Sequence, residues 1–132
     1  MNAKQVIVLR KDLKMRKGKM IAQGSHAVQY SILQNAKFTE EGFSVNYSDF
    51  GVHAHAVKEW LEGKHKKIAV SVNSLEELHK LEAKAREKGL MVNVVTDSGL
   101  TEFGGVSTVT GMSIGPAEEE FFTGLTDHLQ LL

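Results

Sequence analysis

The stretch QVIVLRKDLKMRKGKMIAQGSHAVQY, residues 5–30, joins a short apolar run to a basic loop and then to a segment with helical periodicity. The run QVIVLR, residues 5–10, is rich in β-branched residues, which is typical of a buried strand. Residues 18–34 are predicted to form a helix, because their polar side chains recur at helical spacing. These side chains share one face within roughly 60° of arc and are Lys19, Gln23, His26 and Tyr30. A buried strand followed by an amphipathic helix indicates an α/β fold.

The opposite face of the 18–34 helix carries apolar side chains at Ile21, Val28 and Ile32, with Gly24 and Ser25 beside them. Small residues allow a helix to approach its neighbour closely, so we expect this face to pack on a sheet. The polar face should then meet a loop across a shallow site.

The chain downstream predicts two more helices, three more strands and a short terminal helix. Ser74 and Glu77 form a capping box at the start of one helix, and Gly89 ends it. Pro116 is placed at the start of a short acidic helix that reaches about Phe122, because proline suits a first helical turn. In chain order, the predicted elements are a loop at 36–52, a helix at 54–62, a strand at 67–72, the Ser74 helix, strands at 91–95 and 109–114, and the Pro116 helix.

This order of elements predicts a three-layer α/β/α sandwich around a four-stranded mixed sheet. Neither a repeat nor a linker divides the chain, so residues 1–132 are expected to form one domain, with the tail LQLL packed back on it. The chain has no cysteine, which excludes disulfides and thiolate metal sites. No apolar run approaches the ~20 residues of a membrane helix, and the N-terminus begins a strand instead of a signal peptide. We therefore expect an intracellular protein with no membrane partner.

Positive charge is concentrated near the start of the chain, although the formal net charge is zero. Six lysines and arginines between residues 10 and 19 are opposed only by Asp12. A local cluster of this kind suits an anionic partner, but a solvated charged loop explains a basic run equally well.

Two common ligand sites do not fit the residues. Gly18-Lys19 lacks the glycine and the hydroxyl residue of a phosphate-binding P-loop, because Leu13 and Met20 occupy those positions. His53 and His55 have no cysteine or carboxylate at metal-binding spacing, so ordinary surface histidines are the better interpretation.

A covalent nucleophile is not indicated either. Ser25 and His26 are neighbours on a helix and point ~100° apart, so they do not form a catalytic pair with a distant Asp97. Asp97 opens a loop at the end of a strand, where open α/β folds tend to place ligands. Its alternative role is that of a turn residue that bonds its own backbone. The hydroxyl residues of this loop are Ser98, Thr101, Ser107, Thr108 and Thr110.

Two motifs in order resemble those of one family. The first, RKDLKMRKGKMIAQGSHAV at residues 10–28, is similar to the Asp-Leu-Lys-Met loop, Gly-Lys pair and Gln-x-Ser-His helix of peptidyl-tRNA hydrolases of the second type. The second, DSGLTEFGGVSTVTGMSIGP at residues 97–116, resembles their Asp-Ala-Gly-x-Thr stretch, with a later threonine and Ile-Gly-Pro. The ending at residues 123–132 resembles the family's close, so the resemblance covers nearly the whole chain.

The resemblance implies hydrolysis of the ester that joins a peptide to the terminal ribose of tRNA, with no metal or organic cofactor. It also implies a homodimer in the cytoplasm. Asp97 would orient or deprotonate water, and Lys19 would stabilise negative charge. The catalytic residues that the resemblance implies are Lys19, Gln23, His26, Asp97, Thr101 and Thr108. The residues expected to bind the nucleic acid are Arg10, Lys11, Lys14, Arg16 and Lys17.

The sequence also departs from the family. Leu100 and Glu102 stand where the family often has arginine and glutamine, and residues 37–53 are an atypical insertion. Two rival functions therefore stay open: a non-catalytic tRNA- or RNA-binding module on the same scaffold, and a protein-interaction domain that uses the aromatic segment 38–50. Salt-dependent affinity for RNA would separate these rivals.

Overall fold

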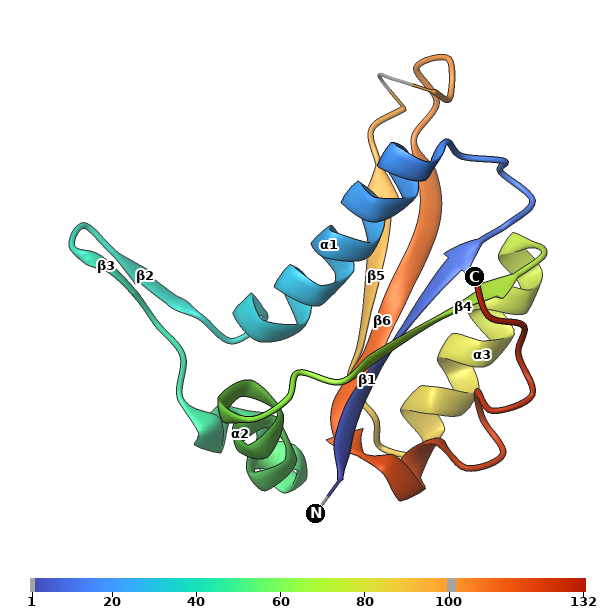
Figure 1. Cartoon of the computed structure of the whole chain (residues 1–132). Helices are drawn as coiled ribbons and strands as arrows, with labels where there is room; N and C mark the ends of the chain where they lie inside the picture. The colour runs from blue at the N-terminus through green and yellow to red at the C-terminus, as the bar shows by residue number, and fades with distance from the viewer. Residues whose placement is uncertain (1, 100–101) are drawn as a thin grey trace.

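A mixed sheet of four strands lies at the centre of the molecule, in the order β4-β1-β6-β5 (Figure 1). The computed structural model describes residues 2–99 and 102–132. β1 runs parallel to β4 and antiparallel to β6, and β6 pairs antiparallel with β5. The strands are β1 Ala3–Arg10, β4 Lys67–Val72, β5 Val92–Asp97 and β6 Thr108–Glu118. The predicted four-stranded mixed sheet is therefore confirmed.

Helices cover both faces of this sheet (Figure 1). The three helices are α1 Lys17–Leu33, α2 Ala54–Glu62 and α3 Leu75–Glu87. Side chains alternate between the two faces along β1. Val6 and Val8 pack in the core with α3, whereas Gln5 Nε2 donates a hydrogen bond to Ser31 Oγ of α1 at 2.7 Å. α2 packs with α1 on the same face. The predicted α/β/α sandwich is confirmed.

The ends of α3 have the predicted caps. Ser74 Oγ accepts a hydrogen bond from Glu77 N at 3.0 Å, and the Glu77 carboxylate accepts one from Asn73 N. Gly89 follows the helix with a φ of +81°, a left-handed conformation that glycine adopts without strain. The boundaries of α3 were therefore encoded locally.

The segment predicted to be one long loop at 36–52 is more ordered, so that prediction is wrong. It contains a hairpin of β2 (Lys37–Thr39) and β3 (Gly42–Ser44), followed by the 3₁₀ helix Tyr47–His53. Phe38 and Phe43 lie opposite each other across the hairpin. Its turn residues, Glu-Glu, are not the Asn-Gly or Asp-Gly pair that usually signals a two-residue hairpin.

The helix predicted to start at Pro116 is also wrong. Pro116 lies inside β6, after a cis peptide bond, because β6 continues to pair with β1 as far as Glu118. The register shifts between Lys4 and Val6 of β1, and such bulges are where a strand tolerates proline. The 3₁₀ helix Glu119–Phe122 begins three residues later.

The face of α1 that packs on the sheet differs from the predicted one. Its buried residues are Gln23, Gly24, Ala27 and Ser31, whereas Ile21 is 69% exposed. The cause is a polar sheet surface, from which three side chains bond to α1: Gln5 to Ser31 Oγ, Thr110 to Gln23 Oε1, and Ser113 to the Ala27 carbonyl oxygen. A polar surface selects polar and small helix residues, so the larger apolar residues lie on a flank of α1.

The C-terminal tail packs back on the domain, as predicted. Ser71 N donates a hydrogen bond to the Gln130 carbonyl oxygen at 2.9 Å, and Leu132 N donates to the Ala69 carbonyl oxygen at 3.0 Å.

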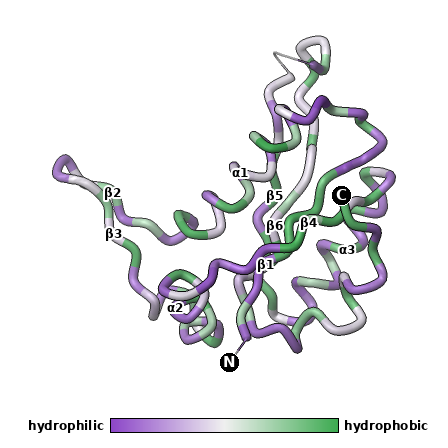
Figure 2. Tube along the Cα trace, in the orientation of Figure 1, coloured by the Kyte–Doolittle hydropathy of each residue, from purple (hydrophilic) through white to green (hydrophobic). Residues whose placement is uncertain are grey.

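Figure 2 shows β4 as hydrophobic and the loop between β1 and α1 as hydrophilic. Within residues 2–99 and 102–132, no helix has the length and apolar character needed to cross a bilayer.

Candidate active site

The centre of the site is an ion pair between the first turn of α1 and the end of β5. Lys19 Nζ lies 2.7 Å from Asp97 Oδ1, and the two side chains are 13% and 11% exposed. Asp97 is the last residue of β5, which ends two residues later than predicted. The polar helix face and the loop after a strand therefore meet, as the sequence predicts.

Asp97 accepts further hydrogen bonds from two other groups. Gln23 Nε2 donates to Oδ1 at 3.5 Å, and Gly99 N donates to Oδ2 at 2.8 Å. The hydrogen bond from Lys19 is the main cause that holds the pKa of Asp97 below its ordinary value, and it outweighs burial, which raises that pKa. The Gly99 N–H lowers the pKa further. Asp97 is consequently a carboxylate at neutral pH.

Thr110 is a member of this network that sequence reasoning did not select. It is fully buried in β6, and its hydroxyl donates to Gln23 Oε1 at 2.7 Å. This bond fixes the orientation of the Gln23 amide, so that Nε2 points to Asp97. Thr110 lies two residues after Thr108, and residues two apart share a strand face, so spacing alone does not distinguish the two threonines.

The remaining predicted catalytic residues are Thr108, His26 and Thr101. Thr108 is opposite Asp97 in the β5–β6 register, and its hydroxyl donates to the Val106 carbonyl oxygen at 2.8 Å. His26 is exposed and stacks on Tyr30, with ring centroids 6.1 Å apart, and its charge contributes to lowering the pKa of Asp97. Thr101 lies outside the described residues.

Two residues of the loop after β5 add to the surroundings of the ion pair. Lys19 Nζ lies 5.7 Å from the centroid of the Phe103 ring, within the range of a cation–π contact. Glu102 Oε1 lies 3.7 Å from Arg16 Nε. Glu102 therefore places a negative charge beside the basic loop.

The basic loop between β1 and α1 presents most of its charges to solvent. Arg10 is the exception, because its guanidinium pairs with the Asp12 carboxylate at 2.7 Å and donates to the Val109 carbonyl oxygen at 3.1 Å. The exposed members of the predicted nucleic-acid surface are Lys11, Lys14, Arg16 and Lys17. These four precede Lys19 by two to eight residues, so the loop leads into the site.

The sheet and this site define an α/β protein with a shielded carboxylate–ammonium pair at one end of a mixed sheet. The family model described as "Peptidyl-tRNA hydrolase PTH2" matches residues 3–132, and the chain belongs to this family. The resemblance in the two motifs is thereby confirmed.

Curated relatives span the same length. A "Peptidyl-tRNA hydrolase" of Methanocaldococcus jannaschii is 38% identical over 129 residues, which cover 98% of this chain and 99% of the relative. Proteins of the same name are 36% identical in Thermococcus onnurineus, over 98% of this chain and 97% of the relative, and 38% identical in Methanothermobacter thermautotrophicus, over 98% and 99%.

Proposed function

We propose that this protein hydrolyses peptidyl-tRNA, releasing free tRNA and a peptide. The observation that carries the proposal is the Lys19–Asp97 pair, which is shielded at the end of the sheet in a chain whose family match covers residues 3–132. In this reaction the oxygen of water bonds to the acyl carbon, the bond from that carbon to the ribose oxygen breaks, and the ribose hydroxyl leaves with a proton.

Asp97 is the residue we assign to water. An ionised carboxylate offers about four lone-pair positions. Lys19, Gln23 and Gly99 occupy three of them among the described residues. A water molecule at a remaining position would be oriented toward the ester and would give up a proton as it attacks.

Lys19 is the residue we assign to the developing negative charge. Its ammonium sits in a partly buried site, where a fixed positive charge stabilises an oxyanion more strongly than it does in open water. Gln23, held by Thr110, positions Asp97. Thr101, Thr108 and His26 are proposed to complete the contacts to substrate and water.

The exposed cations of the basic loop are proposed to bind tRNA phosphates. Each phosphate neutralised makes the affinity salt-dependent, with a slope of ~0.7–0.9 in a double-logarithmic plot. Arg10 is proposed to act indirectly, because its pairing with Asp12 shapes the loop. Glu102 would reduce the effective charge of Arg16.

A non-catalytic RNA-binding module on the same scaffold is the less favoured function. The relatives that match this chain over nearly their whole length are named as hydrolases. We also propose a single domain over residues 1–132, assembly as a homodimer and a location in the cytoplasm. These follow from the sequence and from the family resemblance.

The test is release of tRNA from N-acetyl-aminoacyl-tRNA by the purified protein, with aminoacyl-tRNA bearing a free amine as the substrate to be spared. We expect kcat to fall about 10²–10³-fold in Lys19→Ala and about 10²–10⁴-fold in Asp97→Asn. Lys80→Ala is the matched control, because Lys80 pairs with Glu76 on the exposed surface of α3. An inactive wild type that still binds tRNA would support the module instead. Wild-type rates in both site variants would remove Lys19 and Asp97 from the mechanism.

A further inference from the structure

The hairpin of residues 37–44 projects from the body of the protein as an arm (Figure 1). Every residue of its two strands is exposed. Phe38 and Phe43 are 69% and 65% exposed, and their ring centroids lie 6.0 Å apart. A two-stranded hairpin alone is marginally stable in water, and paired exposed phenylalanines are costly to leave in solvent. The arm therefore has the character of an element that is covered by another surface.

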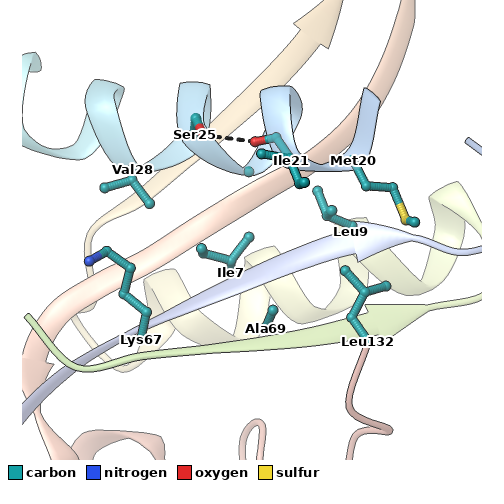
Figure 3. Close-up of a pocket in the computed structure, with 10 residues that line it drawn as sticks. Ile7, Leu9, Met20, Ile21, Ser25, Val28, Lys67, Ala69 and Leu132 are labelled. Carbon is teal, nitrogen blue, oxygen red and sulfur yellow. Dashed lines mark hydrogen bonds between the residues drawn. The ribbon is translucent and has the colours of Figure 1, made fainter. Parts of the chain in front are cut away.

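A second apolar feature is the α1–β4 groove, which lies between one flank of α1 and the strands β1 and β4 (Figure 3). Its volume is about 380 Å³. Ile7, Ile21 and Val28 give it apolar walls, Leu132 lies at its border with the tail, and Lys67 is its charged residue. Gly24 and Ser25 line it, whereas the adjacent Gln23 points to Asp97, so the groove and the active site are on different flanks of α1.

We infer that the arm of one molecule docks in the α1–β4 groove of a second copy, and that the exchange is reciprocal. Phe38 and Phe43 enter the groove, and the acidic turn of the arm lies beside Lys67. This inference goes beyond the hydrolytic reaction and does not depend on it.

Charge selects a protein surface over RNA as the occupant of the groove and as the partner of the arm. Glu40 and Glu41 form the exposed tip of the arm and would be repelled by phosphates. The same two carboxylates are complementary to Lys67, which is exposed. The arm and the groove thus match each other in both apolar character and charge.

The area involved reaches the minimum expected of a biological interface. A phenylalanine buries about 150–250 Å² when it is covered completely. Four phenylalanines that are already about one-third covered, together with the groove walls that receive them, would bury roughly 1,000 Å², the lower range for a specific interface.

Reciprocal docking is required for a closed dimer. One arm inserted into one groove without the return contact is a heterologous contact, which repeats around a ring or along an open chain. A two-fold arrangement satisfies both arms and both grooves, and leaves no arm exposed.

Analytical ultracentrifugation of the full chain, without RNA, tests the inference. We expect the wild type to form dimers, and the double variant Phe38→Ser/Phe43→Ser to have a dissociation constant at least tenfold higher. Leu75→Ser is the matched control, because Leu75 is an exposed apolar residue on α3, and it should change the dissociation constant less than twofold. An unchanged far-ultraviolet circular dichroism spectrum of the double variant will show that its fold is intact.

A cross-link locates the contact, because the chain has no cysteine of its own. Ser44→Cys places a thiol on the arm, and Ser25→Cys places one in the groove. A short thiol-specific cross-linker should join a mixture of these two variants, and should join Ser44→Cys poorly to Ser107→Cys, which lies in the loop before β6.

Three results would overturn the inference. They are a monomeric wild type at every concentration, a dimer or larger assembly that tolerates loss of both phenylalanines, and equal cross-linking of the two mixtures. Weaker tRNA affinity of the double variant, with association unchanged, would assign the arm to RNA instead. A failed hydrolysis assay leaves these measurements intact, since they use protein alone.

Discussion

Asp97 receives its hydrogen bonds from three separate parts of the local structure: the first turn of α1, the second turn of α1, and its own loop. Lys19 and Gln23 are one helical turn apart, so a single helix delivers both to the same carboxylate. Gly99 donates through its backbone N–H at a φ of +85°, and a Cβ there would collide with the backbone of Val106. The carboxylate is therefore fixed from several directions before any substrate arrives.

The lowered pKa of Asp97 predicts how the stability of the protein changes with pH. A carboxyl whose pKa is lower in the folded protein adds stability above about pH 4, and that stability is lost as pH falls through the folded pKa. Removing the ammonium in Lys19→Met leaves burial as a raising influence on the Asp97 pKa. We expect the difference in Tm between wild type and Lys19→Met to be largest above pH 5 and to shrink below about pH 4. Thermal unfolding from pH 3 to 8 measures it, and a constant difference would contradict the assignment.

Thr110→Val tests the buried support of Gln23. The substitution keeps the shape of the side chain but removes the O–H that holds Gln23 Oε1, so the amide loses its fixed orientation. We expect kcat to fall roughly tenfold, with a smaller change in KM. Thr108→Val is the matched comparison on the same strand, and its hydroxyl bonds to the Val106 carbonyl oxygen. A larger loss of kcat in Thr108→Val would give Thr108 the more direct role.

The site was predictable in part. Helical spacing placed Lys19 and Gln23 on one face, and the end of a strand placed Asp97 within reach. The role of Thr110 could not be predicted from the sequence. Its partner, Gln23, is 87 residues away, and Thr108 offers the same chemistry on the same strand face. Such a choice depends on the register of β6 against β5, which shifts between Val95 and Thr96.

At the scale of elements, local signals predicted boundaries well and packing poorly. The cap of α3 and the limits of α2 follow from neighbouring residues, and both agree with the sequence. The orientation of α1 depends on the polar residues of strands that are distant in the chain, so its own apolar residues were misleading. The β2–β3 hairpin lacks a standard turn signal, and Pro116 belongs to β6 because pairing with β1 overrides its local preference.

Gly24 in α1 is expected to be replaceable by alanine with a gain in stability. A Cβ at Gly24 would lie 3.6 Å from Ile7 Cγ2, an ordinary contact, and alanine is favoured over glycine inside a helix by roughly 0.5–1 kcal/mol. We expect Gly24→Ala to raise Tm by about 2–4 °C. Gly111→Ala is the opposite case, because its Cβ would collide with the Val8 carbonyl oxygen in the neighbouring strand. Calorimetry of both variants checks the pair, and equal effects would contradict the packing described for α1 and β6.

At the scale of the whole molecule, the sheet has one edge that the tail protects. Residues 130–132 pair with Ala69 and Ser71 on the outer side of β4, and an uncovered edge strand is a template for association. Deleting residues 130–132 removes these backbone bonds and is expected to cost about 1–3 kcal/mol and to promote aggregation. Urea unfolding and light scattering measure the two effects. Leu131→Ala is the control, because it keeps the backbone pairing, and it should remain close to wild type.

The order of the strands in the sheet also determines when each strand pairing can form during synthesis. β1 is synthesised before its two neighbours, β4 and β6, which begin more than 55 residues later in the chain. Pairings between such distant segments are slow to form, because the chain loses the entropy of loop closure before these contacts add stability. A chain still attached to the ribosome therefore has β1 without a partner until β4 has emerged, and with one side unpaired until β6 follows. A ribosome stalled before β4 has emerged would leave the apolar, β-branched segment QVIVLR unpaired and exposed.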